Sequence, residues 1–142
     1  AAAQIVTQGN VFAIEINRDI VARLTREVAD LKISNIHPMW GDIELEGGSK
    51  LANESIDFVI LSNALFHLDD KQGCFKEVYR VLKAGGRALI VDWTDSFGGM
   101  GPRPQAVFAK EQAKELTARL GFTFLSENLP AGDHHYAILV KK

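Results

Sequence analysis

The chain has only one cysteine, Cys74, among its 142 residues, so no disulfide can form within one copy. One thiol and four scattered histidines give no zinc-ligand spacing, and His134 and His135 are expected to bracket a turn rather than bind a metal. Blocks of lysine or arginine are also missing, and the formal charge is -2. The sequence therefore lacks the basic footprint of a general nucleic-acid binder, and a small-molecule partner is favoured.

Long apolar runs are absent too. The longest, residues 58–61 and 88–91, have the length of strands and are too short to span a bilayer. The first ten residues have neither the basic start nor the apolar stretch of a signal peptide. These features predict a cytoplasmic protein with no membrane insertion. A hydrophobic content of 46% fits one globular domain over residues 1–142.

The first half of the chain alternates strand and helix signals. Residues 11–16 are uniformly apolar around one acid, which predicts a buried parallel strand, and Asn17 is expected to cap the helix that follows. Residues 36–40 predict an edge strand, because Pro38 cannot donate a ladder hydrogen bond. Residues 44–55 predict a loop, and residues 57–62 predict a central strand.

The second half ends differently from an ordinary dinucleotide-binding fold. A helix is expected from about residue 69 to a left-handed cap at Gly85-Gly86, followed by a strand over residues 87–92. A further helix over residues 110–120 should end at Gly121. Residues 122–128 and 135–140 then predict two antiparallel strands joined by a turn-rich loop. The order indicates one α/β domain with a C-terminal hairpin.

Several segments together carry a family resemblance. They are Gly9-Asn10-Val11-Phe12-Ala13-Ile14-Glu15-Ile16, Trp40-Gly41-Asp42, residues 56–68, and Phe75-Lys76-Glu77-Val78-Tyr79-Arg80-Val81-Leu82-Lys83-Ala84-Gly85-Gly86-Arg87, of which the last is the most specific. With these residues the chain resembles the class I S-adenosylmethionine-dependent methyltransferases, in particular the group similar to the ubiquinone/menaquinone-biosynthesis methyltransferases. Residues 101–102 and 133–142 resemble one subgroup of these enzymes.

The resemblance implies a Rossmann-like sheet of order 3-2-1-4-5-7-6, with helices on both faces, an antiparallel seventh strand, and S-adenosylmethionine across the carboxyl ends of the strands. The family's first strand and glycine-rich loop have no counterpart here, and residues 1–6 resemble only the tail of the helix after them. The sequence is therefore expected to begin roughly 30 to 40 residues late. The missing strand would lie between residues 11–16 and 57–62, and self-association of the chain is left open.

Five residues are expected to hold the cofactor. Glu15 ends a strand, where its carboxylate can accept hydrogen bonds from ribose hydroxyls, and the resemblance places it at the family's ribose-binding position. Asp42 would accept the adenine amino group while the amide of Ile43 meets a ring nitrogen, and Ile16 would pack on the ribose or adenine. Asn63, just after the strand at 57–62, would hold the methionine end. Asp42 as a turn residue, Ile16 as core and Asn63 as a cap are the structural alternatives.

Two residues are candidates for the chemistry. His67 would act as a base on the incoming nucleophile, although a histidine between Phe66 and Leu68 is often structural. Asp92, at the end of the strand over 87–92, would orient a proton, with a turn or cap role as its alternative. The sequence thus predicts methyl transfer to a small-molecule acceptor by in-line displacement, without a metal. A nicotinamide-dependent oxidoreductase, for which Glu15 would serve equally well, and a non-catalytic remnant or interaction module remain alternatives.

Overall fold

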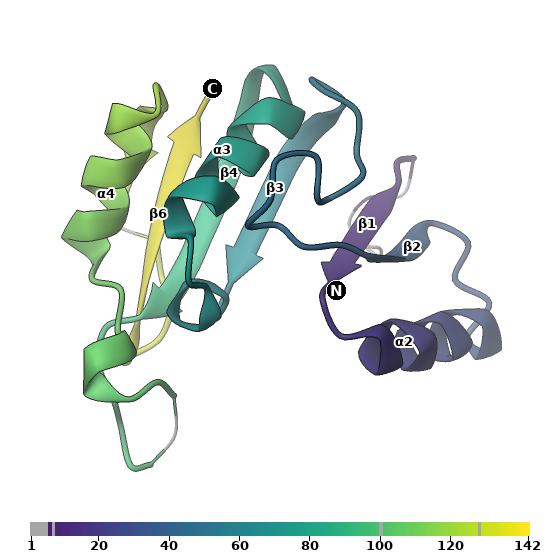
Figure 1. Cartoon of the computed structure of the whole chain (residues 1–142), viewed down its shortest axis with the longest axis horizontal. Coiled ribbons are helices and arrows are strands. Elements are labelled where there is room, and N and C mark those ends of the chain that lie inside the picture. The colour runs from purple at the N-terminus through teal and green to yellow at the C-terminus, as the bar shows by residue number, and fades with distance from the viewer. Residues whose placement is uncertain (1–5, 7, 100, 128) are drawn as a thin grey trace.

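A computed structural model describes residues 6, 8–99, 101–127 and 129–142. The predicted alternation of strands and helices is confirmed, and Figure 1 follows it along the chain. The elements are β1 (Val11–Glu15), α2 (Arg18–Asp30), β2 (Ile36–Trp40), β3 (Ile56–Ser62), the 3-10 turn η1 (Leu65–His67), α3 (Lys71–Val81), β4 (Leu82–Trp93), the 3-10 turn η2 (Pro104–Ala106), α4 (Lys110–Arg119), β5 (Thr123–Ser126) and β6 (His135–Lys141). None of the helices among these residues is long and apolar enough to cross a membrane.

The strands form two separate sheets. Strands β1 and β2 pair in parallel, and β3, β4, β6 and β5 form a second sheet in that order. Within the second sheet β3 runs parallel to β4, whereas β6 is antiparallel to both β4 and β5, which confirms the C-terminal hairpin. Figure 1 shows the β1–β2 pair standing apart from the larger sheet.

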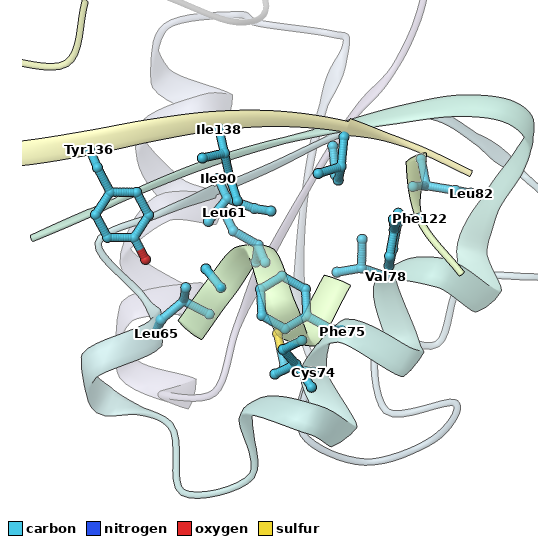
Figure 2. Packing of buried hydrophobic residues seen from close by; sticks show 14 residues of the cluster. Leu61, Leu65, Cys74, Phe75, Val78, Leu82, Ile90, Phe122, Tyr136 and Ile138 are labelled. Carbon is cyan, nitrogen blue, oxygen red and sulfur yellow. The ribbon is translucent and has the colours of Figure 1, made fainter. Parts of the chain in front are cut away.

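The hydrophobic core lies on one face of the larger sheet. Helices α3 and α4 cover this face (Figure 1), and Figure 2 shows how their side chains meet those of the strands. Phe75 and Cys74 of α3 are fully buried, as are Ile90 of β4 and Ile138 of β6. Helix α2 packs instead on β1 and β2. The core therefore belongs to the larger sheet and fixes the positions of the loops at its carboxyl end.

Local signals for helix ends and sheet edges were mostly correct. The side chain of Asn17 accepts hydrogen bonds from the amides of Asp19 (2.9 Å) and Ile20 (3.3 Å), as expected of an N-cap. Pro38 lies in β2, which pairs only with β1 among the described residues and is therefore an edge strand, as expected. Helix α4 ends just before Gly121, whose positive φ of 92° suits glycine.

The expected end of α3 at Gly85-Gly86 was wrong. The helix ends at Val81, and Leu82 is extended and begins β4. The amides of Glu54 and Ser55 donate to the carbonyls of Arg80 (3.0 Å) and Val81 (2.9 Å), so the last turn is capped by the chain that enters β3. A neighbouring segment, invisible in the local sequence, therefore stops the helix early.

The sequence predicted a central strand over residues 57–62, but within the described residues β3 is an edge strand of its sheet. One edge of β1 is unpaired there as well. A cavity of about 660 Å³ lies between them, lined by apolar residues that include Val11, Ile14, Phe58 and Ile60. This is where the sequence resemblance implied a further strand. The prediction that residues 1–6 are the tail of a helix concerns residues that lie mostly outside those described. Asn128, predicted to end a strand, also lies outside them.

Candidate cofactor site

A depression of about 700 Å³ lies where the carboxyl ends of β1, β2 and β3 meet. Its volume is within the range usual for small-molecule sites. The ends of parallel strands share one edge, so side chains that follow different strands converge there. All five predicted cofactor residues and His67 line this depression: Glu15, Ile16, Asp42, Ile43, Asn63 and His67.

Glu15 is the last residue of β1, and its side chain is half-buried. One carboxylate oxygen accepts a hydrogen bond from the amide of Asn17 at 2.8 Å. This bond fixes the carboxylate at the turn from β1 into α2 while the other oxygen makes no hydrogen bond within the described residues. Ile16, next to it, is 56% exposed and presents an apolar surface at the same place. An acceptor beside an apolar surface suits a ribose that carries a base.

Asp42 lies in a tight turn after β2. Its Oδ1 accepts the amide of Glu44 at 3.0 Å, and its own amide donates to the carbonyl of Gly48 at 3.1 Å. A Cβ at Gly48 would lie 1.8 Å from the Asp42 carbonyl oxygen, so this close approach requires glycine. The amide of Ile43 makes no hydrogen bond to another described residue. An acceptor and a donor are thus adjacent, as the edge of an adenine ring requires.

Asn63 follows β3 in a left-handed conformation, with φ of 53°. Asparagine tolerates this region better than most residues. The amide of Asn63 donates to the carbonyl of Val91 at 2.9 Å, which holds the residue against the end of β4. Its side chain is exposed at the depression. His67, also exposed, contacts the ring of Phe66 with a centroid separation of 3.8 Å.

Asp92, the other residue predicted for the chemistry, does not line the depression. It is fully buried in β4, and its Oδ2 accepts the amide of Leu65 at 2.8 Å while Oδ1 accepts the amide of Trp93 at 2.8 Å. This conformation gives the carboxylate no surface for a substrate. The carboxylate of Asp92 therefore accepts backbone hydrogen bonds as a cap residue does, which was the alternative given for it from the sequence.

A buried ion pair on α3 was not anticipated as part of the site. The carboxylate of Glu77 receives hydrogen bonds from the amides of Gly47 (2.8 Å) and Ser49 (3.0 Å) and from Nε of Arg80 (2.8 Å). Arg80 also donates to the carbonyl of Leu51 at 2.8 Å. The pair therefore ties the loop that carries the Asp42 turn to the core. The signal in the sequence is an acid and an arginine three residues apart on a helix.

The environment of Glu77 also changes its titration. Burial alone would raise its pKa, but hydrogen bonds from Arg80, Ser49 and the amides of Gly47 and Ser49 outweigh this effect and lower the pKa from 4.5 to about 2. Cys74, one turn earlier, shows the opposite shift. Burial, together with the nearby charges of Glu44, Glu77 and Asp70, raises the pKa of the Cys74 thiol to about 12. This thiol is consequently protonated at neutral pH and packs as an apolar group.

No group of three or more histidine, cysteine or acidic side chains in the described ranges could hold a metal ion. Of the two histidines predicted to bracket a turn, His134 lies in a turn with Asp133, whereas His135 is the first residue of β6. There Nδ1 of His134 lies 2.9 Å from a carboxylate oxygen of Asp95.

Comparison with known proteins identifies the family. A model described as a methyltransferase domain matches residues 1–90. The chain belongs to this methyltransferase domain family. An arsenite methyltransferase from Halobacterium salinarum is 31% identical over 93 residues, which are 65% of this chain and 23% of that protein. The chain thus spans about a quarter of the length of this curated relative.

Solved structures with the same fold include enzymes of different activity. A SAM-dependent methyltransferase from Aquifex aeolicus matches with a TM-score of 0.86 and 18% identity, covering 98% of this chain and 72% of that one. The [4+2]-cyclase SpnF matches with a TM-score of 0.83 and 12% identity, covering 99% and 69%. At these identities the likeness shows the fold, which is that of class I methyltransferases, and leaves the reaction to the site.

Family membership, with relatives named as S-adenosylmethionine-dependent enzymes, gives S-adenosylmethionine as the cofactor. The side chains that line the depression have the chemical groups that binding of this molecule requires. Two carboxylates could accept from its hydroxyl and amino groups, and the apolar side chains of Ile16 and Ile43 could cover its flat base. The exposed amide of Asn63 could meet its charged amino-acid end.

Proposed function

We propose that this methyltransferase domain transfers a methyl group from S-adenosylmethionine to a small-molecule acceptor by in-line displacement. The observation that carries the proposal is the convergence of Glu15, Asp42 and Asn63, which follow three different strands, on one depression. Each supplies a different polar group: two carboxylates from separate turns and one carboxamide. The likeness to the ubiquinone/menaquinone group and a cytoplasmic location belong to this proposal as expectations from the sequence.

In this proposal each residue has one task. Glu15 binds the ribose, Asp42 and the amide of Ile43 bind the adenine, and Ile16 packs against them. Asn63 orients the methionine end, and the imidazole of His67 takes a proton from the acceptor's nucleophile. The cofactor, when bound, supplies a methyl group activated by its positively charged sulfur. The protein's main contribution is alignment, which in the best model reactions lowers the barrier by roughly 7 to 11 kcal/mol.

The nicotinamide alternative has less support. Glu15 would bind either ribose, but the antiparallel β6 and the family match both favour a methyltransferase. The acceptor is left at the level of a small molecule. The arsenite named for the Halobacterium protein is not carried over, because the match covers only 23% of that protein.

Glu15→Ala is expected to weaken binding of S-adenosylhomocysteine by roughly 5- to 140-fold, the equivalent of about 1 to 3 kcal/mol for a charge-assisted partner. Isothermal titration calorimetry measures this. Glu27→Ala, an exposed acid of α2 outside the depression, is the matched control and should bind as the unaltered chain does. Unchanged affinity in a folded Glu15→Ala protein, or preference of the unaltered chain for NADH, would contradict the proposal.

Asp42→Asn is expected to weaken S-adenosylmethionine and S-adenosylhomocysteine by equal factors, because the adenine is common to both. Asparagine keeps an oxygen for the amide of Glu44, so the turn is retained while the charge is removed. Competition binding with the two ligands gives the ratio. A variant that discriminates strongly between them would place Asp42 near the sulfur instead.

A further inference from the structure

The buried carboxylate of Asp92 has an unusual set of partners. Asp92 is 0% exposed, and its carboxylate accepts hydrogen bonds from two backbone amides, those of Leu65 and Trp93, at 2.8 Å each. No lysine, arginine or histidine of the described residues pairs with it. A carboxylate removed from water is costly unless hydrogen bonds compensate it. Hydrogen bonds from amides to a carboxylate are charge-assisted and short, so the two bonds to the Asp92 carboxylate are expected to be strong.

Leu65 is the partner that links Asp92 to the cofactor depression. It is fully buried and begins the turn η1, and the residue before that turn, Ala64, provides no side-chain cap. Asp92 supplies the missing acceptor from a different strand. The segment around η1 lines the depression with Ser62, Asn63, Ala64, His67 and Leu68. A bond at its middle residue therefore restrains the whole segment.

Tyr136 is the cross-strand neighbour of Asp92 and shares its environment. It is 5% exposed, and its hydroxyl has no hydrogen-bond partner among the described residues. Figure 2 shows this hydroxyl on the side of Leu65. Burial, and secondarily the charge of Asp92, raises the pKa of Tyr136, so the phenol stays neutral. The carboxylate of Asp92 is thus satisfied by the backbone amides of Leu65 and Trp93 and not by the hydroxyl of Tyr136.

We propose that Asp92 is a positioning residue that fixes the segment of residues 62–68 through the amide of Leu65, and so orients Asn63 and His67 toward the depression. The role of that depression rests on the proposed function, but the restraint itself does not. The restraint has two points, because the amide of Asn63 is held separately by the carbonyl of Val91 at 2.9 Å. Asn63, with its φ of 53°, is itself the first of these points, and Leu65, two residues later, is the second.

The bond itself can be measured in the unaltered chain by NMR. A scalar coupling between the amide nitrogen of Leu65 and the side-chain carboxyl carbon of Asp92 is expected across the hydrogen bond. Its absence in a folded, assigned protein would overturn the proposal. This measurement needs no variant and no ligand, so it holds even where substitution of Asp92 prevents folding.

The effect on the segment is tested with Asp92→Asn. Asparagine leaves one acceptor oxygen for two amides, so the Leu65 amide is expected to exchange with solvent at least about tenfold faster, the loss expected for one charge-assisted bond. Shift changes should be confined to residues 62–68 and β4. Tyr136→Phe and the exposed Asp95→Asn are the matched controls and should leave Leu65 unchanged. An Asp92→Asn protein with the exchange and shifts of the unaltered chain would overturn the proposal.

Titration with S-adenosylhomocysteine separates this inference from the proposed function. If Asp92 positions the site, folded Asp92→Asn should lose roughly tenfold in affinity at a temperature well below its melting temperature, whereas a merely stabilising residue would lower the melting temperature and leave this affinity unchanged. Equal affinity of both proteins would overturn the link between Asp92 and the depression. An unaltered chain that binds no S-adenosylhomocysteine but shows the Leu65 coupling would contradict the proposed function and support the restraint.

Discussion

Replacing Glu77 with alanine is expected to destabilise the fold by about 3 to 5 kcal/mol, the usual cost of removing one partner from a buried ion pair. The Glu77 side chain is 2% exposed and that of Arg80 is 18% exposed. Without Glu77, the guanidinium of Arg80 and the amides of Gly47 and Ser49 lose their shared acceptor. Urea unfolding followed by circular dichroism gives the change in free energy.

A control and a second substitution make this result specific. Glu111→Ala removes an acid of α4 that is 67% exposed and is expected to change the free energy of unfolding by less than about 1 kcal/mol. The double variant Glu77→Ala with Arg80→Ala should be less destabilised than the sum of the two single changes, because no unpaired charge remains. A loss for Glu77→Ala no larger than that for Glu111→Ala would show that the pair contributes little.

The same group makes stability depend on acid. The pKa of Glu77 is lowered from 4.5 to about 2 in the fold, so its contribution is fully present above pH 4.5 and is lost as the pH falls toward 2. A displacement of this size corresponds to roughly 3 kcal/mol, since one pH unit corresponds to about 1.4 kcal/mol. Glu77→Gln should remove this part of the pH dependence between pH 5 and 3, and parallel curves for the two proteins would contradict the assignment.

Loss of the Glu77 carboxylate is expected to disturb the cofactor site as well as the stability of the fold. The loop held by Glu77 begins at the turn of Asp42 and Ile43, and the carboxylate of Glu44 also accepts the amide of Asp70 at the start of α3. A Cβ at Gly73 would lie 2.2 Å from the Glu44 carbonyl, which shows how closely the loop and helix approach. Contacts of its loop with α3 therefore help to position Asp42, in addition to the β1–β2 pair that it follows.

Much of this fold could be predicted from short-range sequence patterns. Apolar runs located the strands, Asn17 and Gly121 marked helix ends, and the two final strands predicted the hairpin. The error at the end of α3 has a non-local cause, since the helix is capped by Glu54 and Ser55, which lie 26 positions before Arg80 and Val81 in the sequence (80 − 54 and 81 − 55). Glycine at Gly85 does have a positive φ of 80°, but within β4.

The site shows the same division between local and non-local information. The rule that parallel strands share a carboxyl edge was enough to bring Glu15, Asp42 and Asn63 together. It could not say whether the side chain of Asp92 faces that edge or the core, because one step along a strand reverses the direction. The burial of Glu77 was equally hidden, since an acid next to Lys76 on an amphipathic helix normally faces water.

The separation of the two sheets leads to the second large expected effect, which concerns the association of the 142-residue chain. Strands β1 and β3 each leave one edge without a partner in the part of the chain that the structure describes. Phe58 and Ile60 of β3 are 47% and 53% exposed, and Phe12 of β1 is 40% exposed. Neither strand carries a lysine or a proline to protect its edge. Unprotected edges of this kind pair with other chains.

The purified 142-residue chain is therefore not expected to be a stable monomer, and the cofactor titrations proposed above are expected to report on its associated form. Size-exclusion chromatography with light scattering should give a mass above the 15.6 kDa of one copy, increasing with protein concentration. Phe58→Lys with Ile60→Lys places charges on the edge strand and should shift the population toward monomer, whereas the same change at two exposed positions of α2, Ala22 and Thr25, should not. A 15.6 kDa monomer that melts in one cooperative step and binds S-adenosylhomocysteine tightly would show that the unpaired edges of β1 and β3 need no partner. It would also show that the hydrogen bonds from the loop after β2 to Glu77 of α3 are sufficient to hold the depression together.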